Sequence, residues 1–300
     1  MSTEVARPLV RSERTGAVLV LTLDHPPVNV LSRAVLEALL KRLEEAEADP
    51  RVRVVVLASA AEKAFAAGAD IREMARMGPD EARVHGSRGQ AVTRRIERLP
   101  LPVIAAVHGV CLGGGCEVAL ACDFVLASPD ALFGQPEINL GVTPGWGGSQ
   151  RLPRRIGVAK ARRWIYTGRP VSAAEAHADG WVERIVPRED LLRTAVEFGV
   201  ELAGKPALAL AASKYEILRA ADPSLDAALD YELDLWSRLF GTRDQREGMQ
   251  AFLEKKPLAA RDRSGWSESS LGFPWGEPPD APGASTPSGK RKRDDGSGRD

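Results

Sequence analysis

Residues 103–123 read VIAAVHGVCLGGGCEVALACD, and this stretch decides the fold class. Val103 to Val107 is a nearly continuous apolar run of strand length, a pattern typical of a strand covered on both faces. Three glycines follow at 113–115, and residues 116–122 have the length and composition of a helix. A buried strand, a glycine turn and a helix in this order predict one unit of an α/β protein.

The same alternation continues outward in both directions. Strands are predicted at residues 18–23, 53–58 and 123–127, and helices from Ser32, the expected N-cap, to about Ala48 and from about Pro79 to Arg98. Such alternation favours an α/β architecture with largely parallel strands, and its irregular spacing does not match a regular barrel.

The second half of the chain is mostly helical. Ser172 to Glu175 and Thr242 to Gln245 have the residues of capping boxes at helix starts. We therefore assign residues 1–200 to the core and residues 201–257 to a helical subdomain for packing and oligomerisation. After Pro257 the composition turns to Ser, Gly, Pro, Asp and Arg, which predicts a disordered tail at 258–300.

Composition narrows the classes of partner and cofactor. The 300 residues carry 41 basic and 41 acidic side chains, so net charge favours neither a nucleic-acid nor a membrane partner. A KRKR run in the tail leaves open a non-catalytic role in binding RNA or another partner. The three cysteines have no metal-site spacing and the four histidines are scattered, so we expect reduced thiols and no metal. Without a secretory leader or an 18-residue apolar run, the expected location is the cytoplasm.

Backbone amides are the first candidate site. A helix that begins after Gly113 exposes N–H groups that suit an anion or an oxygen that becomes negative during reaction. Glycine also allows tight packing of helix on strand, which is the structural alternative, while the patterns of phosphate-binding loops are missing. The small residues 64–71, AFAAGADI, offer a second set of amides after a strand, and Asp70 there has the simpler role of a helix cap.

Two carboxylates stand apart from the surface charge. Glu117 lies in the apolar run CEVALAC, and Glu137 lies in the turn FGQPEINLG, and neither has an obvious local cation. A carboxylate in an apolar setting should have a raised pKa, which suits proton transfer, although a structural hydrogen-bonded glutamate would have the same pattern.

Together these segments resemble the enoyl-CoA hydratase/isomerase, or crotonase, family. The motifs that carry the resemblance are AFAAGADI, AAVHGVCLGGGCEVALACD, FGQPEINLGVTPGWGGSQRLPRRIG, TGRPVSAAEAHADGWVERIV and REGMQAFLEKKP, in this order. The resemblance as a whole runs from about residue 16 to residue 257, and the quoted motifs lie between residues 64 and 257.

The resemblance implies an α/β, crotonase-like spiral of ββα units with a helical C-terminal region, and homotrimers or dimers of trimers. It implies an acyl-CoA thioester substrate and no separate cofactor, because coenzyme A enters with the substrate. The implied site residues are the catalytic Glu117 and Glu137, the oxyanion-hole amides of Ala69 and Gly114, Gly145 as a support for the second glutamate, and coenzyme A contacts at Ala67, Ala69, Asp70, Ile71 and Gly114.

With both glutamates present, the resemblance implies a lyase, a 2-enoyl-CoA hydratase of fatty acid metabolism and β-oxidation. A Δ3,Δ2-enoyl-CoA isomerase, which needs one base to move one proton, is the alternative. Two positions depart from the family pattern: His108 stands where many members carry Asn, and Trp146 stands where Ala is common. The acyl chain length does not follow from these motifs.

Overall fold

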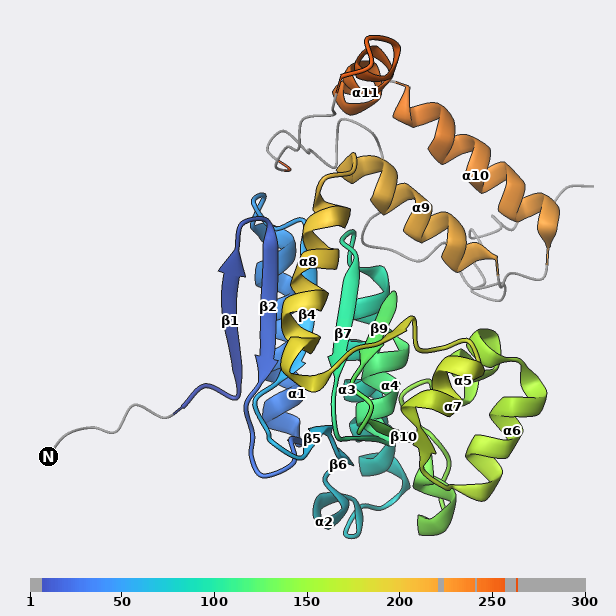
Figure 1. Cartoon of the computed structure of the whole chain (residues 1–300). Coiled ribbons are helices and arrows are strands. Elements are labelled where there is room, and N and C mark those ends of the chain that lie inside the picture. The colour runs from blue at the N-terminus through green and yellow to red at the C-terminus, as the bar shows by residue number, and fades with distance from the viewer. Residues whose placement is uncertain (1–6, 221–223, 241, 257–262, 264–300) are drawn as a thin grey trace, which may run out of the picture.

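A twisted six-stranded sheet forms the centre of the computed structural model, which describes residues 7–220, 224–240, 242–256 and 263 (Figure 1). Its strand order is β1-β2-β4-β7-β9-β12, and only the β1–β2 pair is antiparallel. The strands are β1 (Val10–Thr15), β2 (Val18–Leu23), β4 (Val54–Ser59), β7 (Val103–Val107), β9 (Phe124–Ala127) and β12 (Arg184–Ile185). The predicted parallel sheet is confirmed, and β2 and β7 have the predicted bounds.

Both faces of the central strands are covered. Along β7, Val103, Ala105 and Val107 belong to one apolar cluster, while Ile104 and Ala106 belong to another. Helix α8 (Leu191–Ala203) covers the second face, and α1 (Arg33–Ala48), α3 (Pro79–Arg98) and α4 (Gly114–Leu120) lie on the first (Figure 1). This burial explains the unbroken apolar runs in the sequence.

Each of the strands β4, β7 and β9 is followed by a strand of a smaller sheet and then by a helix. The smaller sheet has the order β11-β10-β8-β5, and β3 pairs with β6 beside it. The strands are β3 (Val30–Leu31), β5 (Ala64–Ala66), β6 (Gly68–Ala69), β8 (Val110–Leu112), β10 (Leu132–Gly134) and β11 (Val171–Ser172). This repetition gives the spiral of ββα units that the resemblance implies.

The helix ends follow the capping signals. Ser32 caps α1, Ser172 and Glu175 form a capping box, and Thr242 accepts from the Gln245 amide at 3.1 Å. Helix α4 begins at Gly114, two residues before the predicted start, because Gly113 with φ 51° forms the turn. The other helices are α2 (Ile71–Met74), α5 (Gly148–Ile156), α6 (Val158–Thr167), α7 (Ala173–Ala178), α9 (Ala207–Arg219), α10 (Leu225–Leu239) and α11 (Arg243–Leu253), with 3-10 turns η1 (Pro136–Leu140) and η2 (Arg188–Asp190).

The helical C-terminal part is joined to the core through α9. The buried Lys214 ammonium on α9 donates to the carbonyls of Ile96 (3.1 Å) and Leu101 (3.0 Å) and to Asp123 Oδ2 (2.8 Å). Asp123 Oδ2 also accepts from the Val103 amide at the start of β7. Helix α10 packs on α9 through Leu235, and α10 and α11 extend away from the sheet (Figure 1).

Arg263 reaches back to the end of α1. Its guanidinium is buried and donates to the carbonyls of Ala46, Glu47, Asp49 and Val52, and its amide donates to Pro50. Packing on the core therefore reaches beyond Pro257 at this residue, which differs from the predicted start of the tail. The rest of residues 258–300 lies outside the described residues.

The described residues also bear on the predictions about membrane-spanning helices, metal sites and cysteine thiols. Among the described residues, no helix combines the length and the apolar character needed to cross a membrane. In the same part of the chain, no three His, Cys, Asp or Glu side chains are grouped so that they could hold a metal ion. The predicted reduced thiols are confirmed, since Cys111, Cys116 and Cys122 are free and buried.

Candidate active site

Glu117 is a buried carboxylate held by backbone amides. It lies on α4 with 2% of its surface exposed, and its Oε1 accepts from the N–H groups of Trp146 (2.7 Å) and Gly148 (2.8 Å). Burial raises the pKa of Glu117, while the amides of Gly148 and Trp146 and the positive charge of Arg151 act in the opposite sense. The amides fix one oxygen, so the carboxylate has a defined orientation.

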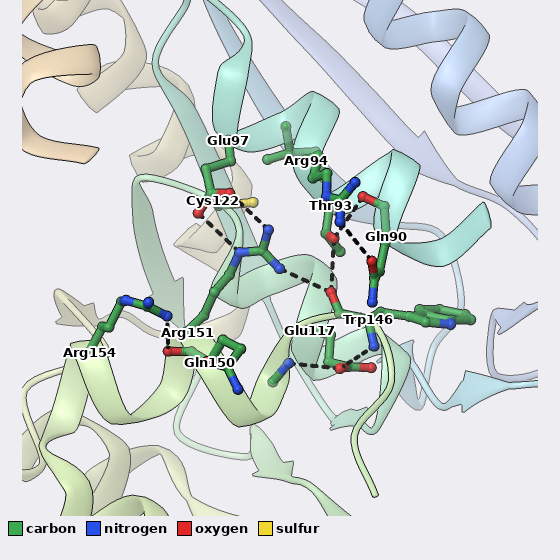
Figure 2. A network of polar contacts seen from close by, with 12 residues as sticks. Gln90, Thr93, Arg94, Glu97, Glu117, Cys122, Trp146, Gln150, Arg151 and Arg154 are labelled. Carbon is green, nitrogen blue, oxygen red and sulfur yellow. Dashed lines mark hydrogen bonds and ion pairs between the residues drawn. The ribbon is translucent and has the colours of Figure 1, made fainter. Parts of the chain in front are cut away.

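The loop that supplies these amides is itself held from its other side. Thr93 Oγ1 on α3 donates to the Trp146 carbonyl at 2.9 Å (Figure 2). Gln90 Nε2 on the same helix donates to the Gly145 carbonyl at 3.0 Å. Arg151 Nη1 donates to the same Trp146 carbonyl at 3.0 Å. In the peptide unit between Gly145 and Trp146, the oxygen is bonded to α3 and the N–H to Glu117. Hydrogen bonds in such a chain polarise one another, which strengthens the bond from the Trp146 amide to the Glu117 carboxylate.

Arg151 is positioned by an ion pair and by a glycine. Its Nε and Nη2 atoms donate to the two Glu97 oxygens at 3.0 Å and 2.8 Å, a bidentate arrangement that fixes the plane of the guanidinium. Gly147 has φ +115°, and a Cβ there would lie 2.0 Å from Arg151 Nη1. The positive φ therefore favours glycine at 147, and a larger residue there would also force the end of the Arg151 side chain to move.

Glu137 lies close to the turn at Gly113, at the start of the helix that carries Glu117, but its environment differs from that of Glu117. It is in η1, and a Cβ on Gly113 would lie 3.2 Å from Glu137 Oε1. Its Oε2 is buried and has no hydrogen-bond partner within the described part of the chain. Burial raises the pKa of Glu137 to about 7, its own backbone amide acts in the opposite sense, and the charge of Glu117 raises it further. The two glutamates are therefore close enough for their titrations to be coupled.

The two predicted amide segments come together at Gly68. A Cβ on this residue would lie 3.0 Å from the Leu112 carbonyl oxygen and 3.5 Å from the Gly114 nitrogen, and its φ is +102°. Strand β6, which ends at Ala69, therefore lies against the start of α4. Gly114 is the first residue of α4, so its N–H has no partner within the helix.

The remaining predicted coenzyme A contacts are Ala67, Asp70 and Ile71. The Ala67 amide donates to the Val28 carbonyl at 3.0 Å. Asp70 caps α2 by accepting from the Arg72 amide at 2.8 Å, so its predicted structural role is confirmed. Ile71 is 55% exposed. The predicted support of Glu137 by Gly145 stays a prediction. In the same loop, the amides of Trp146 and Gly148 donate to Glu117.

Sequence reasoning missed three kinds of residue in this region. It did not assign a role to the amides of Trp146 and Gly148, to Gln90 and Thr93 on α3, or to Gly68, where the first amide segment meets the second. The glycine at 68 inside a run of small residues was the available signal, while the contacts of α3 come from 53 to 55 residues away in sequence. His108, a departure from the family pattern, lies 2.8 Å through Nε2 from the Ala61 carbonyl, a structural contact.

This arrangement is suited to proton transfer beside a polarised carbonyl group. One carboxylate is oriented by two amides, and a second carboxyl group nearby has a pKa near neutrality. Such a pair can divide the tasks of base and acid, because one carboxylate is fixed by two amides and the other has a buried oxygen without a hydrogen-bond partner among the described residues. The amides at the β6–α4 junction could bind an oxygen that becomes negative.

Comparisons with known proteins agree with this geometry. A family model described as enoyl-CoA hydratase/isomerase matches residues 13–263. The chain is 42% identical to a short-chain-enoyl-CoA hydratase of Clostridium acetobutylicum, over 82% of this chain and 95% of the relative, and 40% identical to a crotonyl-CoA hydratase of Syntrophomonas wolfei, over 81% and 94%. The crystal structure of an enoyl-CoA hydratase from Bacillus anthracis superposes with a TM-score of 0.80 at 39% identity, covering 84% of this chain and 98% of that one. The chain therefore belongs to the enoyl-CoA hydratase/isomerase family.

Proposed function

We propose that this protein is a 2-enoyl-CoA hydratase that adds water across the 2,3 double bond of an acyl-CoA thioester. The observation that carries the proposal is the pair of neighbouring glutamates in contrasting environments, Glu117 bonded to two amides and Glu137 with a pKa of about 7. The relatives named as hydratases, at about 40% identity over most of their length, support the same reaction.

In the proposed reaction the thioester oxygen accepts hydrogen bonds from the amides of Ala69 and Gly114. These donors stabilise the enolate that forms when water adds at the β-carbon. Glu117 takes a proton from the attacking water, whose oxygen bonds to the β-carbon. Glu137, protonated at the start, gives its proton to the α-carbon, so the elements of one water molecule are added. The site is restored when Glu117 releases a proton and Glu137 gains one.

The proposed reaction needs no cofactor of its own. Hydration leaves the overall oxidation state of the substrate unchanged, and the amides supply the polarisation of the carbonyl. We propose that coenzyme A contacts the backbone near Ala67, Asp70 and Ile71, which lead to the amide pair. The expected role in β-oxidation and the expected cytoplasmic location stay predictions.

The activity test is loss of the 2-enoyl thioester absorbance on mixing the full chain with crotonyl-CoA. Rapid loss, with 3-hydroxybutyryl-CoA as the product, supports the proposal. Conversion of a 3-enoyl thioester into a 2-enoyl thioester without hydration would instead identify an isomerase. Inactivity in both assays together with salt-dependent RNA binding would identify the non-catalytic alternative.

The pH dependence of this reaction should have the same sign in the two directions, because the pair of glutamates carries one proton before and after the reaction. Hydration requires the proton on Glu137, so its kcat should fall as pH rises through about 7. Dehydration of the 3-hydroxyacyl thioester starts with that single proton on Glu117, so its kcat should also fall once the pair loses the proton. Initial rates in both directions from about pH 5 to about pH 9 measure this. Profiles of opposite sign, or profiles without an inflection near neutrality, would contradict the assigned roles.

We also propose that copies of this chain assemble as trimers or dimers of trimers through the helical C-terminal part. Helices α10 and α11 expose a group of large apolar side chains, which marks an interaction surface. These are Leu229, Leu233, Trp236, Phe240, Met249, Phe252 and Leu253, each at least 43% exposed.

Light scattering should give three or six times the chain mass of 32.3 kDa. Trp236→Asp and Phe252→Asp should shift this mass toward a single chain, because a charge in an apolar interface is costly. Leu192→Asp, an equally drastic change at an exposed leucine on α8, serves as the matched control. A monomeric parent protein would contradict the proposal.

A further inference from the structure

The indole of Trp146 fills a slot between two helices. Only 3% of this residue is exposed. A Cβ on Gly89 of α3 would lie 2.1 Å from the indole Cδ2, and a Cβ on Gly114 of α4 would lie 2.3 Å from Cζ3. The two rings therefore rest directly on the backbones of two glycines, and any larger residue at either position would displace the indole.

The ring is held in this place. The Trp146 carbonyl accepts from Thr93 at 2.9 Å, so the backbone is fixed. His85, which is 6% exposed, backs the indole with ring centroids 5.6 Å apart at 47°. Figure 2 shows the indole projecting to one side of the network while the backbone of the same residue faces Glu117. Close packing on both sides leaves the side chain little freedom to move.

Trp146 also adjoins both groups that define the reacting atoms in the proposed function. Its amide donates to Glu117 at 2.7 Å, and its six-membered ring contacts Gly114, the proposed oxyanion donor. In the proposed binding mode the thioester oxygen lies at the Gly114 amide and the β-carbon lies at Glu117, beside the two groups that Trp146 contacts. Acyl carbons that run from the β-carbon toward α3 would meet the indole.

We infer that Trp146 is a specificity-determining residue that closes the acyl side of the site and restricts the substrates to short-chain 2-enoyl thioesters. Gly89 provides the slot that admits the indole. This inference rests on the proposed function. A rigid, buried indole cannot be displaced by an acyl chain without breaking its packing, so each added methylene should lower kcat/KM by about 10-fold or more once the pocket is full.

The test compares kcat/KM for crotonyl-, octenoyl- and dodecenoyl-CoA in the parent and in Trp146→Ala. The parent should prefer crotonyl-CoA to dodecenoyl-CoA by at least about 100-fold, and the variant should reduce this ratio by about 10-fold or more. The substitution keeps the backbone N–H that holds Glu117, so the readout is the ratio between substrates and not the absolute rate. Trp146→Phe, which leaves a smaller ring, should give an intermediate ratio and guards against a misfolded alanine variant.

Gly89→Ala provides a second, independent test of the role of Trp146. With Trp146 present, the added methyl group has no space and should lower the folded yield or the melting temperature. In the Trp146→Ala background the same methyl group refills part of the slot, so it should be tolerated and should partly restore the preference for crotonyl-CoA. This reversal of effect is a coupling between neighbours that a general loss of stability would not produce.

The possible outcomes distinguish failure of the inference about Trp146 from failure of the proposed hydratase activity. Hydration of dodecenoyl-CoA by the parent as fast as crotonyl-CoA would overturn the inference and leave the hydratase proposal standing. An unchanged ratio in folded Trp146→Ala and Trp146→Phe would do the same. A folded parent protein that hydrates none of the three thioesters would overturn both.

Discussion

Glu117→Gln should lower kcat for 2-enoyl thioester hydration by about 10³-fold, within the range expected for loss of one general base. The glutamine can still present an oxygen to the amides of Trp146 and Gly148, so the local geometry should be kept. Its amide nitrogen cannot take a proton from water. Because the change removes a group that acts in the transition state, the effect should fall on kcat with KM nearly unchanged.

Two further variants sharpen this test. Glu137→Gln should lower hydration by a similar factor and should also remove the alkaline fall in rate, since the group that titrates near neutrality is then absent. Glu62→Gln changes an exposed glutamate outside the site and should leave the rate within about two-fold, since surface substitutions away from special features have small effects. A Glu117→Gln protein with the parent kcat would rule out the role of Glu117 as the base.

Gly68→Ala should lower kcat by about 10²-fold or more, because it disturbs the junction that brings the two proposed oxyanion amides together. At φ +102° an L side chain is strained, and the new Cβ would meet the Leu112 carbonyl oxygen at 3.0 Å and the Gly114 nitrogen at 3.5 Å. Strand β6 would have to move away from α4, and a displaced donor no longer points at the thioester oxygen.

The matched control is Gly86→Ala on α3. A Cβ at this position meets no atom within 4 Å, and the residue is helical, so alanine should be neutral or slightly stabilising and kcat should stay unchanged. Melting temperature and kcat are measured together for both variants. A Gly68→Ala protein with the parent kcat would show that the β6–α4 junction does not position the catalytic amides.

Long, strongly patterned elements could be predicted from the sequence. Strand β7 and helix α3 have the predicted bounds because an unbroken apolar run needs two covered faces and because Pro79 suits the first turn of a helix. Strand β1 was missed, since five of its six residues are exposed and it has the charged sequence VRSERT. The strands of the smaller sheet are two or three residues long, too short to show a period.

The candidate site could be predicted only in part, for a related reason. Glu117 and Glu137 were visible because an acidic residue in an apolar or glycine-rich segment is unusual. The amides that hold Glu117 lie 29 and 31 residues further along the chain, and no local pattern marks an N–H as a ligand. Likewise, the contact of Trp146 with Gly89 depends on how α3 lies against α4, which is a property of the assembled spiral.

The position of Arg263 has a consequence for the order in which the chain can be completed. Its guanidinium binds carbonyl groups at residues 46–52, at sequence separations of 211 to 217 residues. Synthesis proceeds from the N-terminus at about 5–20 residues per second. The carbonyl groups at the end of α1 therefore cannot bind the Arg263 guanidinium until most of the chain has been made. A nascent chain that stops short of residue 263 therefore lacks the group that satisfies these carbonyls, and its first helix remains incompletely capped.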